Sequence, residues 1–222
     1  MVPLLADKRL LIWLAWVNVV VHAVALIFAL VGLRPGSPLV EVPERMHYLS
    51  GHPLAWSLGW GSWMLCTLAL IAFFAALAER LPEKPGAARL AVVLAAVGGA
   101  IDLFCDVIYI TVLPDLASVA SPPYPTFLAM ERAALAGGLI VANGLYALGT
   151  LLLTLCFPGE ARGRVLLMGT GYGVFGFGMV LVVAGFANNS QLAALGTGPT
   201  IALFCLWTVL AARAIACPEA RP

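Results

Sequence analysis

The residues best suited to chemistry in this chain are polar side chains that interrupt long apolar runs. Asn18 and His22 are four positions apart, as are Asp102 and Asp106, so each pair lies on one face of a helix. Ionisable groups inside a bilayer are costly, and they usually face the interior of a helix bundle or water. Because a histidine and aspartates can accept and release protons, these positions predict a site that binds or conducts a proton or a small polar ligand.

A third apolar run contributes Glu131, Arg132 and Asn143. With about 1.5 Å of rise per residue, Asp106 and Arg132 both lie roughly 7–10 Å from the outer ends of their spans. Their equal depth predicts a contact between the two side chains. We expect Glu131 to line the mouth of a cavity beside them.

Two deeper levels follow from the same count. His22 and Asp102 both lie roughly 16 Å from the outer ends, and Asn18 and Asn143 both lie roughly 22–24 Å from them. The matched depths predict a polar seam shared by spans one, three and four, with a contact between His22 and Asp102. The alternative is that these groups only form interhelical hydrogen bonds that hold the helices in register.

The stretch 34–53 between the first two spans holds Glu44, His47 and His52. Glu44 and His47 have the Glu-x-x-His spacing of di-iron carboxylate bundles, although no second helix here repeats it. A metal site formed by these three residues with Glu131 is one hypothesis. A solvated loop with a short amphipathic helix on the membrane is a second, and a lid over the cavity is a third.

The apolar runs themselves indicate a membrane protein. The chain has 222 residues, of which 62% are hydrophobic and 10% charged, and its mean hydropathy is +1.00. A soluble domain typically carries about 25% charged residues, so lipid must cover much of this surface. Six runs have the length needed to cross a bilayer, which predicts an all-α, six-transmembrane-helix bundle forming a single domain over residues 1–222. The expected spans are 10–33, 54–78, 90–113, 127–156, 165–187 and 192–212, with an outer loop at 34–53.

Lysine and arginine set the expected orientation. They gather before span one, between spans two and three, between spans four and five, and after span six. Cytoplasmic loops carry such an excess, so we expect both termini to be cytoplasmic and the chain to be a multi-pass protein of the cell (inner) membrane. The net charge of +1 gives no argument for a nucleic-acid partner.

Proline and glycine mark two helices. Pro114 is expected to stop span three, and Pro199 is expected to kink span six. Gly171, Gly173 and Gly176 match a dinucleotide-binding fingerprint by letters, but no strand precedes them. Close packing of span five against a neighbouring helix is the better interpretation.

Three functions remain open at this point. The leading hypothesis is binding or passage of a proton or small polar ligand from the outer side. The second is an accessory subunit of a larger membrane complex, or a homo-oligomer, in which the helices serve as packing surface. The third is a membrane enzyme, metal-assisted through the histidines of the outer loop. The residues identify no cofactor.

Three segments carry a family resemblance. They are LAWSLGWGSWMLCTLALIAFFAALAERL, ARLAVVLAAVGGAIDLF and FLAMERAALAGGLIVANGLYALGTLLL, in that order, with a glycine-rich span after them. Their layout and hydrophobic texture resemble the DUF4386-like group of bacterial polytopic membrane proteins. That group has no established activity, so the resemblance implies a membrane fold and assigns no functional residues.

Overall fold

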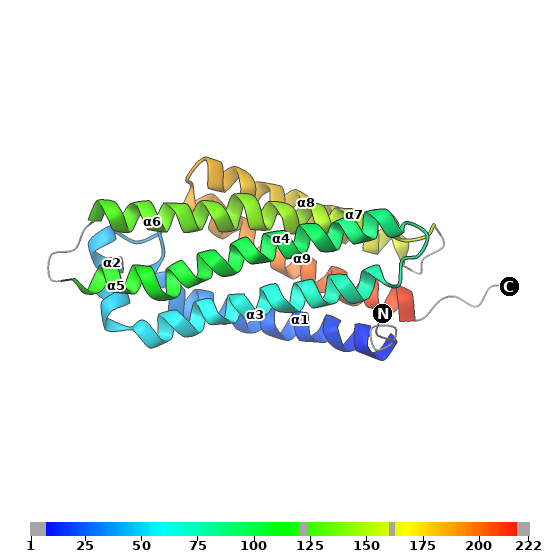
Figure 1. Cartoon of the computed structure of the whole chain (residues 1–222), viewed down its shortest axis with the longest axis horizontal. Helices are drawn as coiled ribbons and strands as arrows, with labels where there is room; N and C mark the ends of the chain where they lie inside the picture. Colours follow the sequence, from blue (N-terminus) through cyan, green and yellow to red (C-terminus); the bar gives the residue numbers. More distant parts are fainter. Residues whose placement is uncertain (1–7, 120–123, 160–162, 217–222) are drawn as a thin grey trace.

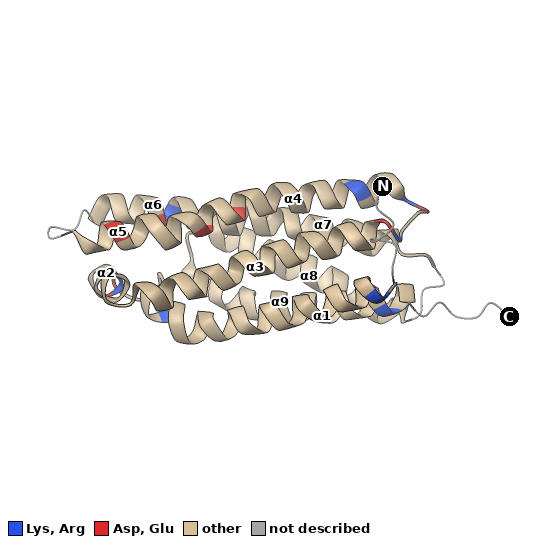
Figure 2. Cartoon of the chain, turned by 60° about the horizontal axis from the view of Figure 1, so that its bottom comes forward, with Lys and Arg blue, Asp and Glu red and all other residues tan. Residues whose placement is uncertain are grey.

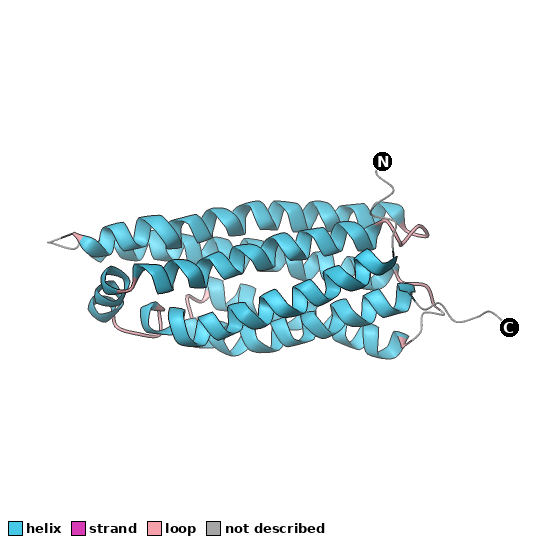
Figure 3. Ribbon diagram, turned by 90° about the horizontal axis from the view of Figure 1, so that it is seen from below, coloured by secondary structure: helices cyan, strands magenta, loops and turns pink. Residues whose placement is uncertain are grey.

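A computed structural model describes residues 8–119, 124–159 and 163–216, and the regular elements in these ranges are all helices (Figure 3). Three of them, η2, η4 and η5, are short π-helical segments, and η3 is a 3-10 turn. In chain order the elements are α1 (Lys8–Phe28), η2 (Ala29–Leu33), η3 (Arg34–Gly36), α2 (Val42–Gly51), α3 (Pro53–Ala78), α4 (Pro85–Val107), η4 (Ile108–Val112), α5 (Leu113–Ser118), α6 (Tyr124–Ala136), η5 (Gly137–Ala142), α7 (Asn143–Cys156), α8 (Arg164–Phe186) and α9 (Ser190–Ala216).

Six helical stretches in the described ranges are long and apolar enough to cross a membrane, which confirms the predicted all-α fold with six spans. The third and fourth, Pro85–Ser118 and Tyr124–Cys156, have 34 and 33 residues, whereas α8 has 23. At about 1.5 Å per residue, the long spans measure about 50 Å and α8 about 35 Å. The long spans therefore extend past the α8–α9 turn, at the end of the bundle that carries α2 (Figure 1). We call this the α2 end, and the opposite end, where α1 begins and α9 finishes, the terminal end.

The spans follow one another in chain order around a closed ring. α1 packs on α3, α3 on α4, α4 on α7, α7 on α8 and α8 on α9, and α9 returns to α1. Short connections make consecutive spans antiparallel, as in an up-and-down bundle. As a consequence, α3 lies between α1 and α4 (Figure 2).

Two hydrophobic clusters fill the ring, one toward each end. The terminal-end cluster is built around aromatic rings whose centroids lie 6.0 to 6.4 Å apart: Phe73, Phe74, Phe204 and Trp207. The α2-end cluster includes Leu33, Met46, Leu49, Trp56, Tyr109 and Phe127. On the third span, the buried members of the first cluster reach Ala95 and those of the second begin at Cys105. The segment between these two residues therefore joins two separately packed halves.

The glycines of α8 form a close contact with the fourth span. Gly171, Gly178 and Gly185 are spaced seven residues apart, so they lie along one face of α8. A Cβ at Gly178 would lie 2.6 Å from the Ala147 Cβ, and one at Gly185 would lie 2.6 Å from the Ile140 Cγ1. Side chains at these positions would overlap α7 and η5. This confirms the packing interpretation for part of the glycine-rich span, whereas a Cβ at Gly169 or Gly176 would meet no atom within 4 Å.

The prediction that Pro114 stops the third span is wrong, because the helix continues to Ser118 through the π turn η4. In that turn the Leu113 N–H donates to the Ile108 carbonyl, five residues earlier. Pro114 has no N–H with which to continue this register, so the Tyr109 carbonyl receives no partner from its own helix. The Trp56 Nε1–H donates to that oxygen across the α3–η4 contact at 2.6 Å. A side chain of span two thereby allows span three to pass through a proline.

Side chains also donate to carbonyls of the other two π turns. The Tyr48 hydroxyl of α2 donates to the Gly32 carbonyl of η2 at 2.7 Å. The Asn143 Nδ2 donates to the Gly138 carbonyl of η5 at 2.9 Å, within the same span. π turns are uncommon and are frequent at functional sites. Here they lie in spans one, three and four, with η2 and η4 toward the α2 end and η5 at the middle of its span.

We expect Gly178→Leu to destabilise the bundle by about 1–3 kcal/mol, because the added side chain must push α8 away from Ala147. The matched control is Gly176→Leu, since a Cβ at Gly176 would meet no atom within 4 Å. Thermal unfolding in detergent should give a lower midpoint for the first variant than for the second. Equal midpoints would contradict the packing role of the α8 glycines.

We expect Trp56→Phe to cost about 1–3 kcal/mol, because it leaves the Tyr109 carbonyl without a donor. In a Pro114→Ala background the alanine N–H can bond that carbonyl, so the same change should cost less. Trp63→Phe serves as the control, since Trp63 is partly buried in the same cluster. A double-mutant cycle read by unfolding tests the coupling, and additive effects of Trp56→Phe and Pro114→Ala would contradict it.

Candidate functional site

A buried ion pair joins α2 to α6. Arg45 Nη2 lies 3.1 Å from Glu131 Oε2, and both side chains are 5% exposed. The Arg45 guanidinium carbon lies 6.0 Å from the centre of the Phe127 ring. Arg45 was not among the site residues expected from the sequence. Leu49 follows four residues after Arg45, one turn along the same face of a helix, and this spacing was a signal that Arg45 is buried.

This pair decides how the stretch 34–53 is built. Arg45, Met46 and Leu49 are the buried face of α2, and α2 packs against α5, η3 and α3. The helix therefore covers protein rather than lying with its apolar face on a membrane. Of the alternatives for this stretch, a cap over the α2 end agrees best with the packing.

Asp102 lies where α3, α4 and α7 meet. The Thr67 hydroxyl donates to its Oδ2 at 2.7 Å, and the Tyr146 hydroxyl donates to the same oxygen at 3.1 Å. Its Oδ1 lies 3.7 Å from the place where a Cβ of Gly138 would be. The carboxylate is thus held on one side by hydroxyls from spans two and four and faces a glycine of the π turn η5 on the other.

Asp106, one turn along α4, has a different environment. Its side chain is 2% exposed, and its Oδ2 has no hydrogen-bond partner in the described part of the chain. The predicted contact with Arg132 is wrong, because Arg132 is exposed while its neighbour Glu131 is buried. Adjacent residues on a helix point about 100° apart, so turning Glu131 toward α2 turns Arg132 outward.

The predicted contact between His22 and Asp102 is also wrong. His22 Nδ1 lies 2.8 Å from the Asn18 carbonyl oxygen, and its ring lies 5.3 Å from the ring of Phe204 on α9. The Asn18 Nδ2 donates to the Ala69 carbonyl of α3 at 3.0 Å. Both residues of span one therefore face α3 and α9, and α3 separates them from Asp102.

The polar seam is therefore formed by other spans than expected: by spans two, three and four instead of one, three and four. Spans three and four contribute Asp102 and Tyr146 as partners, and span two contributes Thr67 in place of span one. Asn143, expected to face the seam, donates within its own span to Gly138. Thr67 could have been found from its hydroxyl inside an apolar run, whereas Tyr146 is about 28 Å from the outer end by the same count, so equal depth did not point to its contact with Asp102.

The proposed metal ligands do not gather. Across residues 8–119, 124–159 and 163–216, no three His, Cys, Asp or Glu side chains come close enough to hold an ion. Glu44 and His47 are exposed, and Glu131 is occupied by Arg45. The exposed ring of His52 stacks on Tyr48, with ring centroids 4.6 Å apart. The geometry of the described residues therefore gives no support to a metal site in this stretch.

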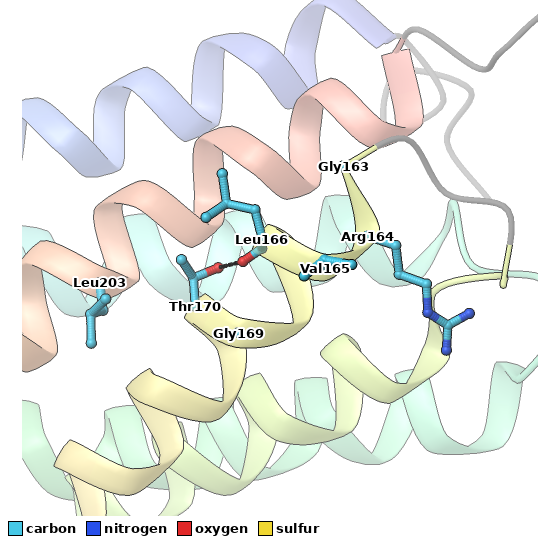
Figure 4. Close-up of a pocket in the computed structure, with 7 residues that line it drawn as sticks. All are labelled: Gly163, Arg164, Val165, Leu166, Gly169, Thr170 and Leu203. Carbon is cyan, nitrogen blue, oxygen red and sulfur yellow. Dashed lines mark hydrogen bonds between the residues drawn. The ribbon is translucent and has the colours of Figure 1, made fainter.

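Two surface pockets lie away from the carboxylates. One, of about 600 Å³, lies between α8 and α9 at the terminal end, and Figure 4 shows its lining residues. The other, of about 340 Å³, is lined by Pro38, Leu39 and residues 187–191 at the α2 end. Neither is lined by Asp102 or Asp106, so neither is the predicted polar cavity.

The arrangement at α4 can bind positive charge. Asp102 and Asp106 lie one turn apart, and neither has an ion pair among the described residues. Carboxylates in a bilayer are costly when uncompensated, and two of them at this spacing repel each other when both are ionised. A proton or a small cation shared by the pair would remove both costs. We call Asp102, Asp106, Thr67 and Tyr146 the acidic site.

Comparison with models of known protein families, with curated proteins and with solved structures finds no match.

We expect Arg45→Met to destabilise the protein by about 3–5 kcal/mol, because it leaves the Glu131 carboxylate buried without a partner. Combining it with Glu131→Leu should restore much of the loss, since no charge is then buried. Arg132→Met, at the exposed neighbour, should change the unfolding midpoint little. A double variant no more stable than Arg45→Met alone would contradict the pairing.

Proposed function

We propose that this chain is a multi-pass membrane protein that binds a proton or a small monovalent cation at the acidic site. The observation that carries the proposal is Asp106, whose side chain is 2% exposed and whose Oδ2 has no hydrogen-bond partner in the described structure. Intramembrane ionisable residues are by default functional, because a merely structural role does not repay their cost.

The alternative of interhelical hydrogen bonding accounts for Asp102 better than for Asp106. Asp102 accepts two hydroxyl hydrogen bonds, from Thr67 and Tyr146, as a residue that holds helices in register would. Asp106 makes no comparable bond, although it lies one turn away on the same helix. Its partner is therefore best supplied by the bound proton or cation. The hydroxyls of Thr67 and Tyr146, which donate to Asp102, offer oxygen ligands for a cation or a relay for a proton.

The distribution of charge supports an orientation for this function. At the terminal end the basic residues of the described ranges are Lys8, Arg9, Arg80, Lys84, Arg89, Arg164 and Arg213. At the α2 end they are Arg34, Arg45 and Arg132, and Glu131 neutralises Arg45. Figure 2 shows the charged residues mostly toward the two ends of the bundle. With the excess of Lys and Arg on the cytoplasmic side, both termini would be cytoplasmic in the cell (inner) membrane, and α2 would face outward.

The other two functions have less support. A metal-assisted enzyme would need ligands gathered from Glu44, His47 and His52, which do not come together. An accessory subunit of a larger complex, or a homo-oligomer, would need a surface that lipid covers poorly. The large exposed apolar side chains of the bundle are equally suited to lipid. The resemblance to the DUF4386-like group adds a membrane fold and no activity.

Labelling with dicyclohexylcarbodiimide tests the proposal, because this apolar reagent modifies protonated carboxylic acids inside membranes. We expect an adduct on the peptide that contains Asp106, lost in Asp106→Asn. Asp115→Asn, which alters an exposed carboxylate of the same span, should leave the adduct unchanged. If a cation is the ligand, excess Na⁺ or K⁺ should protect Asp106. The proposal would be contradicted if the reagent labels other residues of the chain but does not label Asp106, whether or not these ions are present.

Liposomes separate binding from passage. If protons cross through the acidic site, the wild-type chain should dissipate a pH gradient, read by an entrapped dye. Asp102→Asn combined with Asp106→Asn should then reduce the rate to that of protein-free liposomes. An undiminished rate in the double variant would contradict passage through these residues.

A further inference from the structure

The groove at the terminal end has an apolar lining with one basic residue at its end (Figure 4). It lies between α8 and α9, and its lining includes Leu166, Gly169 and Leu203. Thr170 adds little polarity, because its hydroxyl donates to the Leu166 and Leu167 carbonyls of its own helix. The groove therefore presents hydrocarbon along its length.

Glycine keeps this groove open. A Cβ at Gly169 would meet no atom within 4 Å, so the hollow beside it is unfilled by the protein. Val165 and Leu166 beside it are 89% and 54% exposed. The volume of about 600 Å³ is large enough for a stretch of acyl chain and opens toward the lipid-facing surface of α8.

Arg164 supplies the charge. It is the first residue of the membrane-spanning helix α8, where a span meets the headgroup layer. Its side chain points away from Thr170 and Leu203, at the opposite end of the lining residues (Figure 4). It is exposed and has no ion pair among the described residues. A guanidinium fork matches the oxygens of a phosphate.

We propose that this groove holds one acyl chain of an anionic phospholipid whose phosphate pairs with Arg164. The groove is apolar along its length and ends in a cation at headgroup depth. An anionic phospholipid has the same arrangement, with an apolar acyl chain that ends in a charged phosphate. The excess of Lys and Arg at the terminal end favours an anionic over a zwitterionic headgroup. This inference concerns the opposite end of the molecule from α2 and does not rest on the acidic site.

Native mass spectrometry of the detergent-solubilised chain with added phosphatidylglycerol tests the proposal. The wild-type chain should retain this lipid in preference to phosphatidylcholine with the same acyl chains. Arg164→Gln should weaken retention about fivefold, the effect of one interfacial charge. Arg213→Gln, at the same end but outside the groove, should leave it unchanged.

A second pair of variants tests the groove itself. Gly169→Leu should abolish retention by filling the hollow, whereas Gly176→Leu, equally open but outside the groove, should not. Unfolding midpoints establish that each variant is folded. Equal retention in Gly169→Leu and the wild type, equal binding of phosphatidylcholine, or equal binding of soluble glycerol phosphate would each overturn the proposal. If Gly169→Leu fails to fold, unchanged retention in Arg164→Gln overturns it alone.

Discussion

A backbone carbonyl inside a bilayer has no water to accept from, so any break in helical register must be satisfied by another part of the protein. The bond from Trp56 to the Tyr109 carbonyl satisfies this constraint at the point where Pro114 removes a donor. Because of it, the third span continues for 34 residues instead of ending near the proline. That continuation supplies α5, against which α2 packs, and α2 brings Arg45 to Glu131. The architecture of the α2 end thus depends on one indole N–H.

In the fourth span, the π turn η5 lies between the residues that belong to the two hydrophobic clusters. A π turn inserts a residue into a helix and so rotates the face that follows by about 100°. The fourth span can therefore present one face to the aromatic cluster of the terminal end and another to the cluster around Trp56 and Tyr109. Asp102 lies between the two clusters on its helix. Polar groups are less costly outside the apolar clusters, and Asp102 of the acidic site lies at that boundary.

The sequence was sufficient for features that depend on composition along one helix. It predicted six spans, the packing role of the α8 glycines and the placement of carboxylates on one face of span three. It predicted side-chain contacts wrongly, because these depend on the rotation of each helix about its axis and on which helices are neighbours. Equal depth suggested that His22 meets Asp102, but depth does not show that α3 lies between them. In the same way, nothing in the depth of Arg132 showed that Glu131 takes the inward direction.

Pro114 and Arg45 show a different limit. The local rules take a proline as a helix stop and an arginine between two spans as a solvated charge. At Pro114 the rule is overridden by Trp56, which donates to the carbonyl of Tyr109 from more than fifty residues away in sequence. At Arg45 it is overridden by the ion pair with Glu131. Such compensation depends on tertiary contacts, which a single sequence does not reveal.

The unequal heights of the spans have a consequence for the surrounding lipid. A hydrocarbon layer of about 30 Å suits the 23 residues of α8, whereas the 34 residues of the third span exceed it by several turns. The bundle therefore has a low side and a tall side, and the lipids in contact with it face a different hydrophobic mismatch on each. A bilayer that matched the tall side would have to thin next to α8. The protein should consequently tilt, or sort between membranes, in response to bilayer thickness.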